Sequence, residues 1–398
     1  MKEVLEPVLN VLLFPLSRLF PRSPRRWAFG HIGGTFEGNP KFLFLWLSLH
    51  RPDLSIVWIT GDRATIRLLH AHGYPVRRRW SAGGIWAALR ARVFVVAHGP
   101  DNVNLPLSSG ALLINLWHGV GLKPIQYGDP NGAVVRARRR ARGRAFGYLR
   151  ELKFLRSPDA LITTSAFTRA HFAQQCELAE ENCPALGYPR LDCATDPQLR
   201  AAAEALEPAD RPCFDATETY IYMPTFRDGE GDFLADAIPD YARLSAVLAA
   251  RGAVLYVKLH PRTAAVLPAD WPNIRPWPKH ADFQTYLARF TGLLTDYSSV
   301  LYDYLYLKPT GAILYTFDEA RYRRDDRALL YDFDANTAGT RAASFDELCD
   351  VLADGRALQP DASGQLARVR ERFWGTAHGP AAPAIVHYVE ERLQARDG

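Results

Sequence analysis

Four short polar clusters follow predicted strands, and each contains side chains that could carry chemistry. In the first, a strand ending at Leu116 runs into Trp117-His118-Gly119. Histidine changes its protonation state near neutral pH, so His118 could act as a general base if the strand end faces a ligand. The other interpretation of His118 is a hydrogen-bonded structural histidine.

The remaining three clusters contain groups that could hold phosphate. Arg227, within residues 223–228 (MPTFRD), could grip phosphate oxygens with its planar guanidinium. His260, within residues 258–261 (KLHP), could neutralise charge on a departing phosphate. Ser298 and Ser299 follow Asp296 and precede an apolar helix over residues 300–307, whose first N–H groups could attract phosphate. Taken singly, Asp296 and the serines are also ordinary helix caps, but the four clusters together favour a site for phosphate transfer.

Short apolar runs alternate with helical stretches along most of the chain. The predicted strands cover residues 27–30, 55–60, 93–97, 111–116 and 160–164, and then 220–224, 253–259, 292–295 and 311–315. This alternation is typical of an α/β protein with parallel sheets and helices on both faces. Because such sheets bind ligands at the carboxyl ends of their strands, we expect the four polar clusters to line one cleft.

Two facing Rossmann-like domains with a central cleft are the simplest organisation for these elements. The chain has 398 residues, more than one hydrophobic core usually organises, and its 48% hydrophobic content excludes an intrinsically disordered protein. We expect an N-terminal segment over residues 1–26, a first domain over 27–205, a linker over 206–219 and a second domain over 220–380. A last helix over residues 381–398 could cross back to the first domain.

The first 26 residues combine an apolar helix with a basic cluster. Apolar residues recur at helical spacing between residues 4 and 20, but polar residues interrupt the run, which is too short to span a membrane comfortably. Arg22, Arg25 and Arg26 follow it. The pattern predicts an amphipathic helix on the inner face of the cell membrane, and the alternative is a helix packed on the protein's own core.

A second basic region carries eight arginines between Arg136 and Arg156, opposed by Glu151, although the formal net charge of the chain is only +5. A solvated helical face would explain such a run, and attraction to anionic lipid or to a diphosphate acceptor is the functional interpretation. We expect no nucleic-acid partner, because few aromatic residues and no nucleic-acid motif accompany the charge. The candidate residues are Arg136, Arg138, Arg139, Arg140, Arg142 and Arg144.

The five cysteines form no CxxC pair, and we expect reduced thiols in a cytoplasmic protein. A zinc site built from Cys176, Cys183 and Cys193 with His171 would match no familiar spacing. The acidic pair in residues 332–334 (DFD) is interpreted as structural or solvated. The sequence therefore predicts neither a metal nor a cofactor.

The order and spacing of five motifs resemble the CDP-glycerol:poly(glycerophosphate) glycerophosphotransferase family. They are WHG (117–119), MPTFRD (223–228), KLHP (258–261), TDYSSVLYDY (295–304) and YTFDEARYR (315–323), preceded by a similar segment, FEGNPKFLFL (36–45). The resemblance covers residues 27–380. It implies a GT-B fold, cleavage of CDP-glycerol at its inner phosphoanhydride bond, and release of CMP.

The resemblance also implies roles for individual residues. His118 and His260 would be catalytic, with His118 as the general base. Arg227, His260, Ser298 and Ser299 would contact the donor phosphates. Asp296 would lie near the transferred polyol or orient the serines.

The predicted function is transfer of glycerol phosphate from CDP-glycerol to a lipid-linked saccharide of the undecaprenyl diphosphate type, or to a growing polymer, in teichoic-acid-like, capsule or surface polysaccharide synthesis. CDP-ribitol is the nearest alternative donor. A sugar transferase of the same fold, with Asp296 and Asp303 as donor-binding acids, is a second alternative. A membrane-bound module that only binds polyanions is a third.

Overall fold

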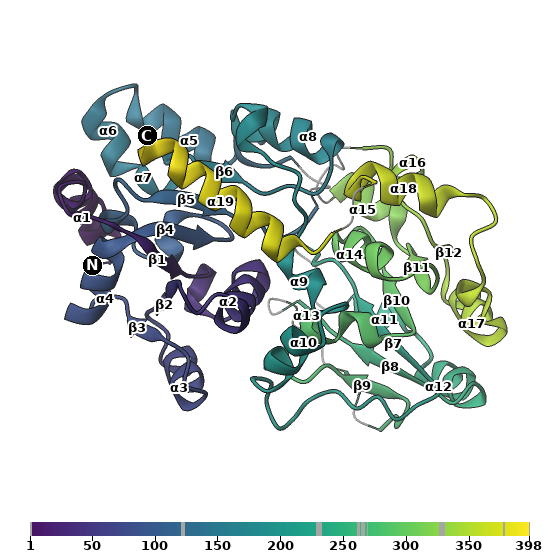
Figure 1. The fold of residues 1–398 in the computed structure, drawn as a ribbon. Coiled ribbons are helices and arrows are strands. Elements are labelled where there is room, and N and C mark those ends of the chain that lie inside the picture. The colour runs from purple at the N-terminus through teal and green to yellow at the C-terminus, as the bar shows by residue number, and fades with distance from the viewer. Residues whose placement is uncertain are drawn as a thin grey trace. The chain divides into compact units, whose positions relative to one another are not determined.

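The computed structural model describes residues 2–120, 124–227, 233–260, 263, 267–268, 270–325, 331–376 and 379–397. The chain forms two compact units, which we describe separately (Figure 1). The first unit comprises Met1–His118, Ile125–Leu206 and Gly375–Gly398. The second comprises Gly119–Pro124 and Glu207–Trp374.

The first unit contains a six-stranded parallel sheet in the order β3-β2-β1-β4-β5-β6. Its strands are β1 (Ser23–Phe29), β2 (Ser55–Thr60), β3 (Val76–Arg78), β4 (Ala91–Val96), β5 (Leu112–Asn115) and β6 (Ala160–Leu161). The strand order reverses between β1 and β4, which is where open parallel sheets place their ligands.

Helices cover both faces of this sheet, so its central strands are apolar on both sides. Trp27 and Phe29 enter one core with α2 (Gly38–His50) and α19 (Ala381–Asp397). Ala28, between them, enters the other core with α4 (Ala82–Arg90). The other helices of this unit are α1 (Lys2–Ser17), α3 (Arg63–Ala71), α5 (Ala133–Ala141), α6 (Ala145–Arg150), α7 (Leu152–Leu155), α8 (Ala166–Cys176), α9 (Pro189–Asp192) and α10 (Pro197–Glu204).

The C-terminal helix α19 is held to the first unit by a buried carboxylate. Asp192, at the end of α9, accepts hydrogen bonds from the backbone N–H groups of Ala381 (2.8 Å) and Ala382 (2.7 Å). Burial raises the pKa of Asp192 from 3.8 to about 6. Figure 1 shows α19 beside α9 and α2, so the last residues of the chain complete the core of the first unit.

The second unit repeats this topology. Its parallel sheet has the order β12-β11-β10-β7-β8-β9. Read from the β9 edge, the strands come in the same order along the chain as in the first sheet: third, second, first, fourth, fifth and sixth. The strands are β7 (Glu218–Met223), β8 (Ala253–Val257), β9 (Ile274–Pro276), β10 (Gly292–Thr295), β11 (Ala312–Tyr315) and β12 (Thr340–Ala342). The order reverses between β7 and β10.

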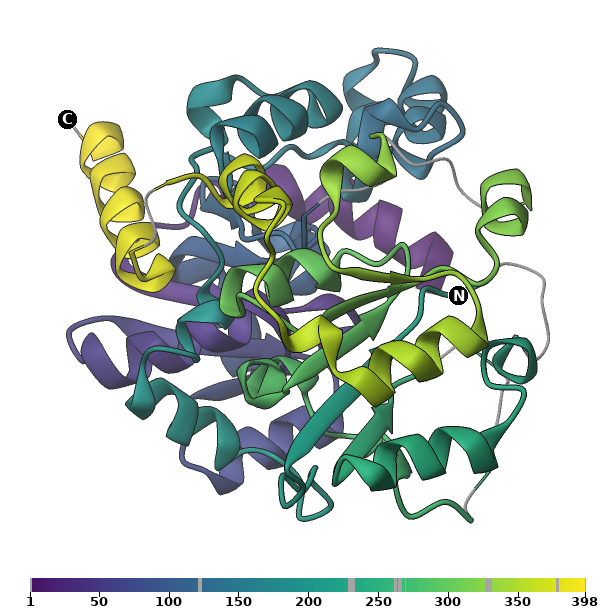
Figure 2. The same ribbon diagram turned by 90° about the vertical axis from the view of Figure 1, so that its right-hand side faces the viewer.

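Figure 2 shows α12 (Tyr241–Ala250) and α17 (Phe345–Asp354) side by side, and both pack into one core with the sheet. On α14 (Val300–Leu307), Tyr302 packs against Phe373 of α18 (Gln365–Trp374), with ring centroids 4.2 Å apart. The remaining helices of this unit are α11 (Leu234–Ala237), α13 (Phe283–Tyr286), α15 (Glu319–Asp325) and α16 (Phe333–Asn336).

The N-terminal helix α1 packs on the first unit, so residues 1–26 do not form the separate segment that we predicted. The polar residues Asn10 and Ser17 are buried, and the carbonyl oxygen of Phe14 accepts a hydrogen bond from Ser17 Oγ. The expected boundary at Arg26 falls inside β1, which begins at Ser23. Helix α1 nevertheless leaves Val8, Leu12 and Leu16 about half exposed.

Arg22, expected to serve a membrane anchor, is instead committed to the protein's own backbone. Its guanidinium donates hydrogen bonds to the carbonyl oxygens of Ala88, Ala91, Leu107 and Ser109. These bonds join the residue before β1 to α4, to the start of β4 and to the segment before β5. Arg22 therefore stabilises the first unit and is not available to lipid headgroups.

Candidate active site

Three histidines follow three neighbouring strands at the carboxyl edge of the first sheet. His31 follows β1, His98 follows β4 and His118 follows β5. The rings of His98 and His118 are stacked, with centroids 4.1 Å apart and planes 8° from parallel. His31 meets His98 edge-on at 5.5 Å. The parallel topology therefore gathers residues that are far apart in the sequence into one cluster.

A single hydrogen bond determines the tautomer of His118. Its Nδ1 lies 3.1 Å from the carbonyl oxygen of Ala97. A carbonyl oxygen can only accept, so we assign the proton to Nδ1 and the lone pair to Nε2. Nε2 is thus the atom that could take a proton from a substrate.

The turn that carries His118 is held in an uncommon backbone conformation. Trp117 has a φ of 56°, which is rare for a residue with a side chain. The side chain of the fully buried Asn39 donates hydrogen bonds to the carbonyl oxygens of Leu116 and Trp117, both at 3.0 Å. Asn115 Oδ1 accepts from the N–H of Trp117 at 2.9 Å. Strain held in place by such contacts is typical of functional sites.

His98 and His118 line a pocket of about 290 Å³ in the first unit. Its wall includes the aromatic residues Trp117, Tyr127 and Phe154 together with Lys153. The pKa of His118 is lowered, chiefly by loss of hydration inside the protein and secondly by the electrostatic effect of His98. His118 as a whole residue is nevertheless exposed to solvent, so a substrate can reach it. His118 is therefore an uncharged base at neutral pH.

The prediction placed His118 correctly at a strand end but missed His31 and His98. The signal was present in the sequence, because a His-Gly pair follows a predicted strand in both cases: His98-Gly99 directly after residue 97, and His118-Gly119 one residue after Leu116. Asn39 was noticed only as part of a family-like segment. Its buried contacts give it a role in supporting the His118 turn.

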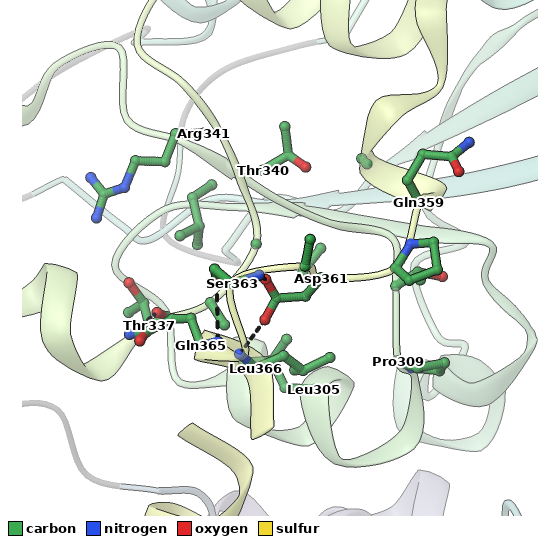
Figure 3. Close-up of a pocket in the computed structure, with 18 of the residues that line it drawn as sticks. Leu305, Pro309, Thr337, Thr340, Arg341, Gln359, Asp361, Ser363, Gln365 and Leu366 are labelled. Carbon is green, nitrogen blue, oxygen red and sulfur yellow. Dashed lines mark hydrogen bonds between the residues drawn. The ribbon is translucent and has the colours of Figure 1, made fainter. Parts of the chain in front are cut away.

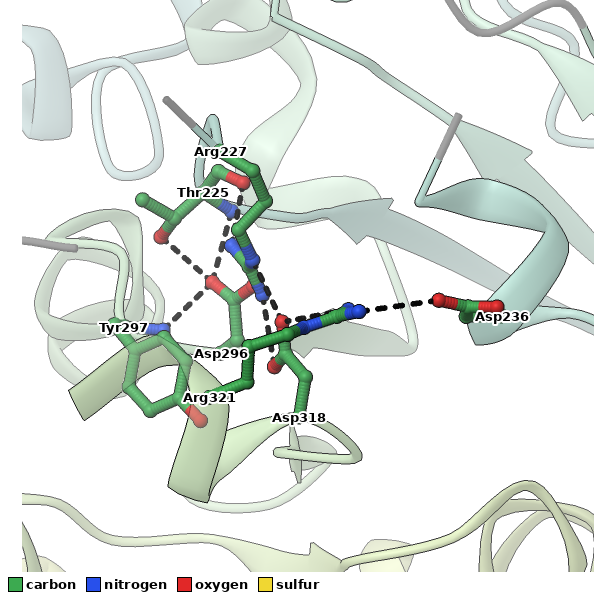
Figure 4. Close-up of polar contacts among 7 residues, drawn as sticks. All are labelled: Thr225, Arg227, Asp236, Asp296, Tyr297, Asp318 and Arg321. Carbon is green, nitrogen blue, oxygen red and sulfur yellow. Dashed lines mark hydrogen bonds and ion pairs between the residues drawn. The ribbon is translucent and has the colours of Figure 1, made fainter. Parts of the chain in front are cut away.

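The carboxyl edge of the second sheet contains a buried ion network around Arg227 (Figure 4). Arg227 Nη2 lies 2.8 Å from Asp296 Oδ2, and Nε lies 2.8 Å from Asp318 Oδ2. Its Nη1 donates to the carbonyl oxygen of Thr225 at 2.6 Å. Asp296 Oδ1 in turn accepts from Thr225 Oγ1 and from the N–H of Tyr297, both at 2.6 Å. The network joins the loops that follow β7, β10 and β11.

This geometry revises the predicted roles of Arg227 and Asp296. Arg227 is 2% exposed and Asp296 is fully buried. Burial alone would lower the pKa of Arg227, but Asp296 and Asp318 raise it well above its ordinary value. The Arg227 guanidinium also lies 4.9 Å from the ring centroid of Tyr322. The guanidinium of Arg227 is thus engaged by Asp296, Asp318 and the carbonyl oxygen of Thr225, and Asp296 also holds Thr225 and Tyr297.

Arg321 also belongs to this network, and its side chain, unlike that of Arg227, is partly exposed to solvent. Its side chain is 35% exposed and lies 3.3 Å from Asp236 and 3.8 Å from Asp318. A pocket of about 370 Å³ is lined by Asp236, Phe317, Asp318, Ala320 and Arg321. The motif in residues 315–323 was noticed in the sequence, but the prediction assigned no role to Asp318 or Arg321.

His260 and the two serines lie at the same edge of the second sheet. His260, beyond β8, is exposed and contacts the ring of Phe226 with centroids 5.2 Å apart. Ser298 and Ser299 are half-buried at the start of α14, and Ser298 Oγ accepts weakly from the N–H of Val300 at 3.5 Å. These side chains remain candidates for contact with a ligand. Asp228 and Pro261, also parts of the predicted motifs, lie outside the described residues.

Other candidate residues have structural partners. Asp332 caps α16 by accepting from the N–H of Ala335 at 2.7 Å, and Asp334 pairs with Arg341. The five cysteines are free thiols, and burial raises the pKa of Cys176 to about 12. Among the described residues, no cluster of His, Cys, Asp or Glu could hold a metal ion.

A second pocket in this unit, of about 360 Å³, lies where β11 and β12 begin (Figure 3). It is lined by residues just before these strands, such as Thr310 and Gly339, and by Asp361, which accepts from the N–H of Leu366 at 2.6 Å. Ligands of parallel sheets bind at the opposite, carboxyl edge. We therefore do not assign this pocket to the candidate site.

The sequence pattern of the CDP-Glycerol:Poly(glycerophosphate) glycerophosphotransferase family matches residues 14–391, nearly the whole chain. The chain belongs to this family. The predicted resemblance is thus confirmed. Curated proteins that resemble the chain include enzymes named for glycerol phosphate and enzymes named for ribitol phosphate.

Three curated relatives illustrate this range. The chain is 26% identical over 273 residues to a teichoic acid poly(ribitol-phosphate) polymerase of Bacillus spizizenii, covering 66% of the chain but only 41% of the relative. It is 22% identical to a teichoic acid glycerol-phosphate transferase of Staphylococcus aureus, covering 80% and 81% of the two chains. It is 23% identical to a teichoic acid poly(glycerol phosphate) polymerase of B. spizizenii, covering 86% of each.

The solved structure of the wall teichoic acid polymerase TagF has the same fold. It superimposes with a TM-score of 0.74 at 19% identity and covers 99% of this chain and 98% of the TagF chain. This likeness, with the two six-stranded parallel sheets, confirms the predicted α/β fold of GT-B type. The family assignment makes the chain a transferase of teichoic-acid type.

Proposed function

We propose that this protein transfers glycerol phosphate from CDP-glycerol to a hydroxyl group of a lipid-linked saccharide or polymer and releases CMP. The observation that carries this proposal is the hydrogen bond of His118 Nδ1 to Ala97, which leaves Nε2 unprotonated in a residue that lines a pocket. A base of this kind suits an acceptor hydroxyl, which must lose its proton as it attacks phosphorus. A TagF variant soaked with CDPG has the same fold, which supports the choice of donor.

In the proposed reaction, the acceptor oxygen attacks the phosphorus that bears glycerol, in line with the bond to CMP. The hydroxyl proton passes to Nε2 of His118. The phosphoanhydride bond breaks, and its electron pair leaves on the CMP oxygen. Ser298 and Ser299, with the N–H groups that begin α14, hold the donor phosphates, and His260 meets the charge that develops on CMP. Arg227 keeps these loops in place without touching the donor.

The donor is tested by measuring CMP release with CDP-glycerol, CDP-ribitol and a panel of nucleotide sugars. We expect turnover with CDP-glycerol, and CDP-ribitol is the second candidate because the curated relatives include both types. Turnover with a nucleotide sugar alone would contradict the proposal. The burial of Asp296 and Asp303, at 0% and 2% exposure, already disfavours them as donor-binding acids of a sugar transferase.

We also propose that one surface of the first unit binds the inner face of the cell membrane, where the lipid-linked acceptor would be presented. Helix α1 lies against α6 and exposes Val8, Leu12 and Leu16 at 49%, 56% and 53%. Phe146, on α6, is 65% exposed. None of the helices, within the described residues, is long and apolar enough to cross a bilayer. An exposed apolar stripe of this kind suits insertion at a membrane surface.

The predicted arginines lie next to this apolar surface. All six are exposed, four on α5 and two in the turn that leads to α6: Arg136, Arg138, Arg139, Arg140, Arg142 and Arg144. Two of them are engaged in ion pairs, Arg138 with Glu177 and Arg140 with Glu151. The others add positive charge beside apolar side chains, and this combination favours anionic lipid.

The double change Leu12→Glu with Leu16→Glu should weaken binding to anionic liposomes by roughly tenfold or more, because it places charge on the inserted stripe. Co-sedimentation with liposomes measures the effect. Leu49→Glu is the matched control, since Leu49 is 42% exposed on α2, away from this surface. Equal binding by the double variant and the control would contradict the assigned membrane surface.

A further inference from the structure

The ring that stacks on His118 belongs to His98, which takes no part in the proposed reaction. His98 lies 4.1 Å from His118, ring to ring, in the same pocket. Its backbone is held on both sides, because its N–H donates to Asn102 Oδ1 at 3.2 Å and its carbonyl oxygen accepts from Asn115 Nδ2 at 2.8 Å. Asn115 also accepts from the N–H of Trp117. One asparagine therefore sets the positions of both histidine turns.

We propose that His98 is a positioning residue that sets the orientation and the charge state of His118. This inference rests on the proposed function, in which His118 is the general base. The His118 ring lies between two flat neighbours, since Trp117 stacks on it at 4.4 Å and His98 at 4.1 Å. The two contacts and the hydrogen bond of Nδ1 to Ala97 together fix the orientation of the His118 ring. Small errors in the position of a reacting group can reduce a rate about a hundredfold.

The same stacking opposes a second positive charge. Two imidazolium rings at 4.1 Å repel each other, so a proton on either ring makes protonation of the other harder. Burial, and then His31, lower the pKa of His98 to about 4. His98 Nδ1 is buried without a hydrogen-bond partner among the described residues, which leaves nothing there to stabilise a charged ring.

Other charged or titratable groups also act on this site. Asp101 and Lys153 pair at 3.4 Å in the pocket wall. The remaining groups near the two rings are His31, Tyr127, Arg156, Cys176 and Arg190. Arg190 lowers the pKa of His118 further. His98 is the one among these groups that stacks on the His118 ring, so its removal should have a specific effect on that ring.

The test compares His98→Ala with His98→Phe, which keeps a flat ring but cannot titrate. We expect His98→Ala to lower kcat about 10- to 100-fold with little change in KM for CDP-glycerol. His98→Phe should recover most of that loss. It should also move the acidic limb of the pH profile to higher pH, because protonation of His118 is no longer opposed. His70→Phe, an exposed histidine on α3, is the matched control and should resemble the unchanged protein.

A second measurement does not depend on activity. Titration of the His118 ring by NMR, with labelled histidine, should give a higher pKa in His98→Phe than in the unchanged protein. Identical titration curves, or a kcat within twofold of normal for His98→Ala, would overturn the proposal. If the unchanged protein released CMP from no CDP-polyol, the proposed function would fail, but the NMR titration would still decide the role of His98.

Discussion

Replacing His118 with alanine is expected to reduce the rate of transfer by about a hundred- to ten-thousand-fold, which is the usual contribution of a positioned general base. Donor affinity should change little, because His118 belongs to the first unit and acts on the acceptor hydroxyl. The loss should not be recovered by raising the concentration of CDP-glycerol. Steady-state release of CMP and calorimetric binding of the donor measure the two quantities separately.

His260→Ala provides the comparison for this result. His260 is exposed at the edge of the second sheet, so its loss should impair both donor binding and turnover. If His118→Ala lost donor affinity as severely as His260→Ala, the division into an acceptor-side base and donor-side phosphate contacts would be wrong. Near-normal turnover by His118→Ala would remove it as the base.

The second large effect is expected for Arg227→Met, and it concerns stability more than catalysis. Breaking a buried ion pair by removing one partner typically costs about 3–5 kcal/mol, since the remaining charges stay buried without compensation. The side chains of Arg227 and its two carboxylate partners are each at most 3% exposed. Urea denaturation should therefore show a large decrease in the free energy of unfolding of the second unit.

Acidification should narrow the difference between Arg227→Met and the unchanged protein. Without Arg227, burial disfavours the charged form of the two carboxyl groups, so the loss of stability that the change causes should become smaller as the pH falls. Arg243→Met is the matched control, because Arg243 is 43% exposed in its pair with Asp346. Exposed pairs contribute about 0–1 kcal/mol. A similar loss in both variants would contradict the organising role of Arg227.

The sequence predicted every interior strand of the two sheets and one outermost strand, β6, which is shorter in the structure than expected. Central strands such as β2 and β10 are continuous apolar runs, and their predicted bounds match the structure. Three strands were not predicted: β3, β9 and β12. Each is an edge strand of its sheet and is three residues long. Each contains an arginine, and β9 also contains Pro276. An edge strand pairs on one side only, so its sequence need not be apolar or alternate.

The function of a polar residue depended on contacts that the local sequence does not contain. Arg227 was predicted to bind phosphate because arginine after a strand end often does. The structure pairs it with Asp318, 91 residues away, and with Asp296, 69 residues away. Arg22 was assigned to a membrane anchor because it belongs to a basic cluster after an apolar helix, and carbonyl oxygens of residues 88–109 hold it instead.

The sequence by itself determined the α/β class, the repeated strand-helix order, the family, and the placing of His118, His260, Ser298 and Ser299 at strand ends. Those features follow from local apolar patterns and from short motifs. Only the tertiary structure decided which strand ends are neighbours, and so brought His31, His98 and His118 together and enclosed Arg227 between two carboxylates. The physical reason is that burial and pairing of charge arise from strand order and packing, which join residues that no local pattern relates.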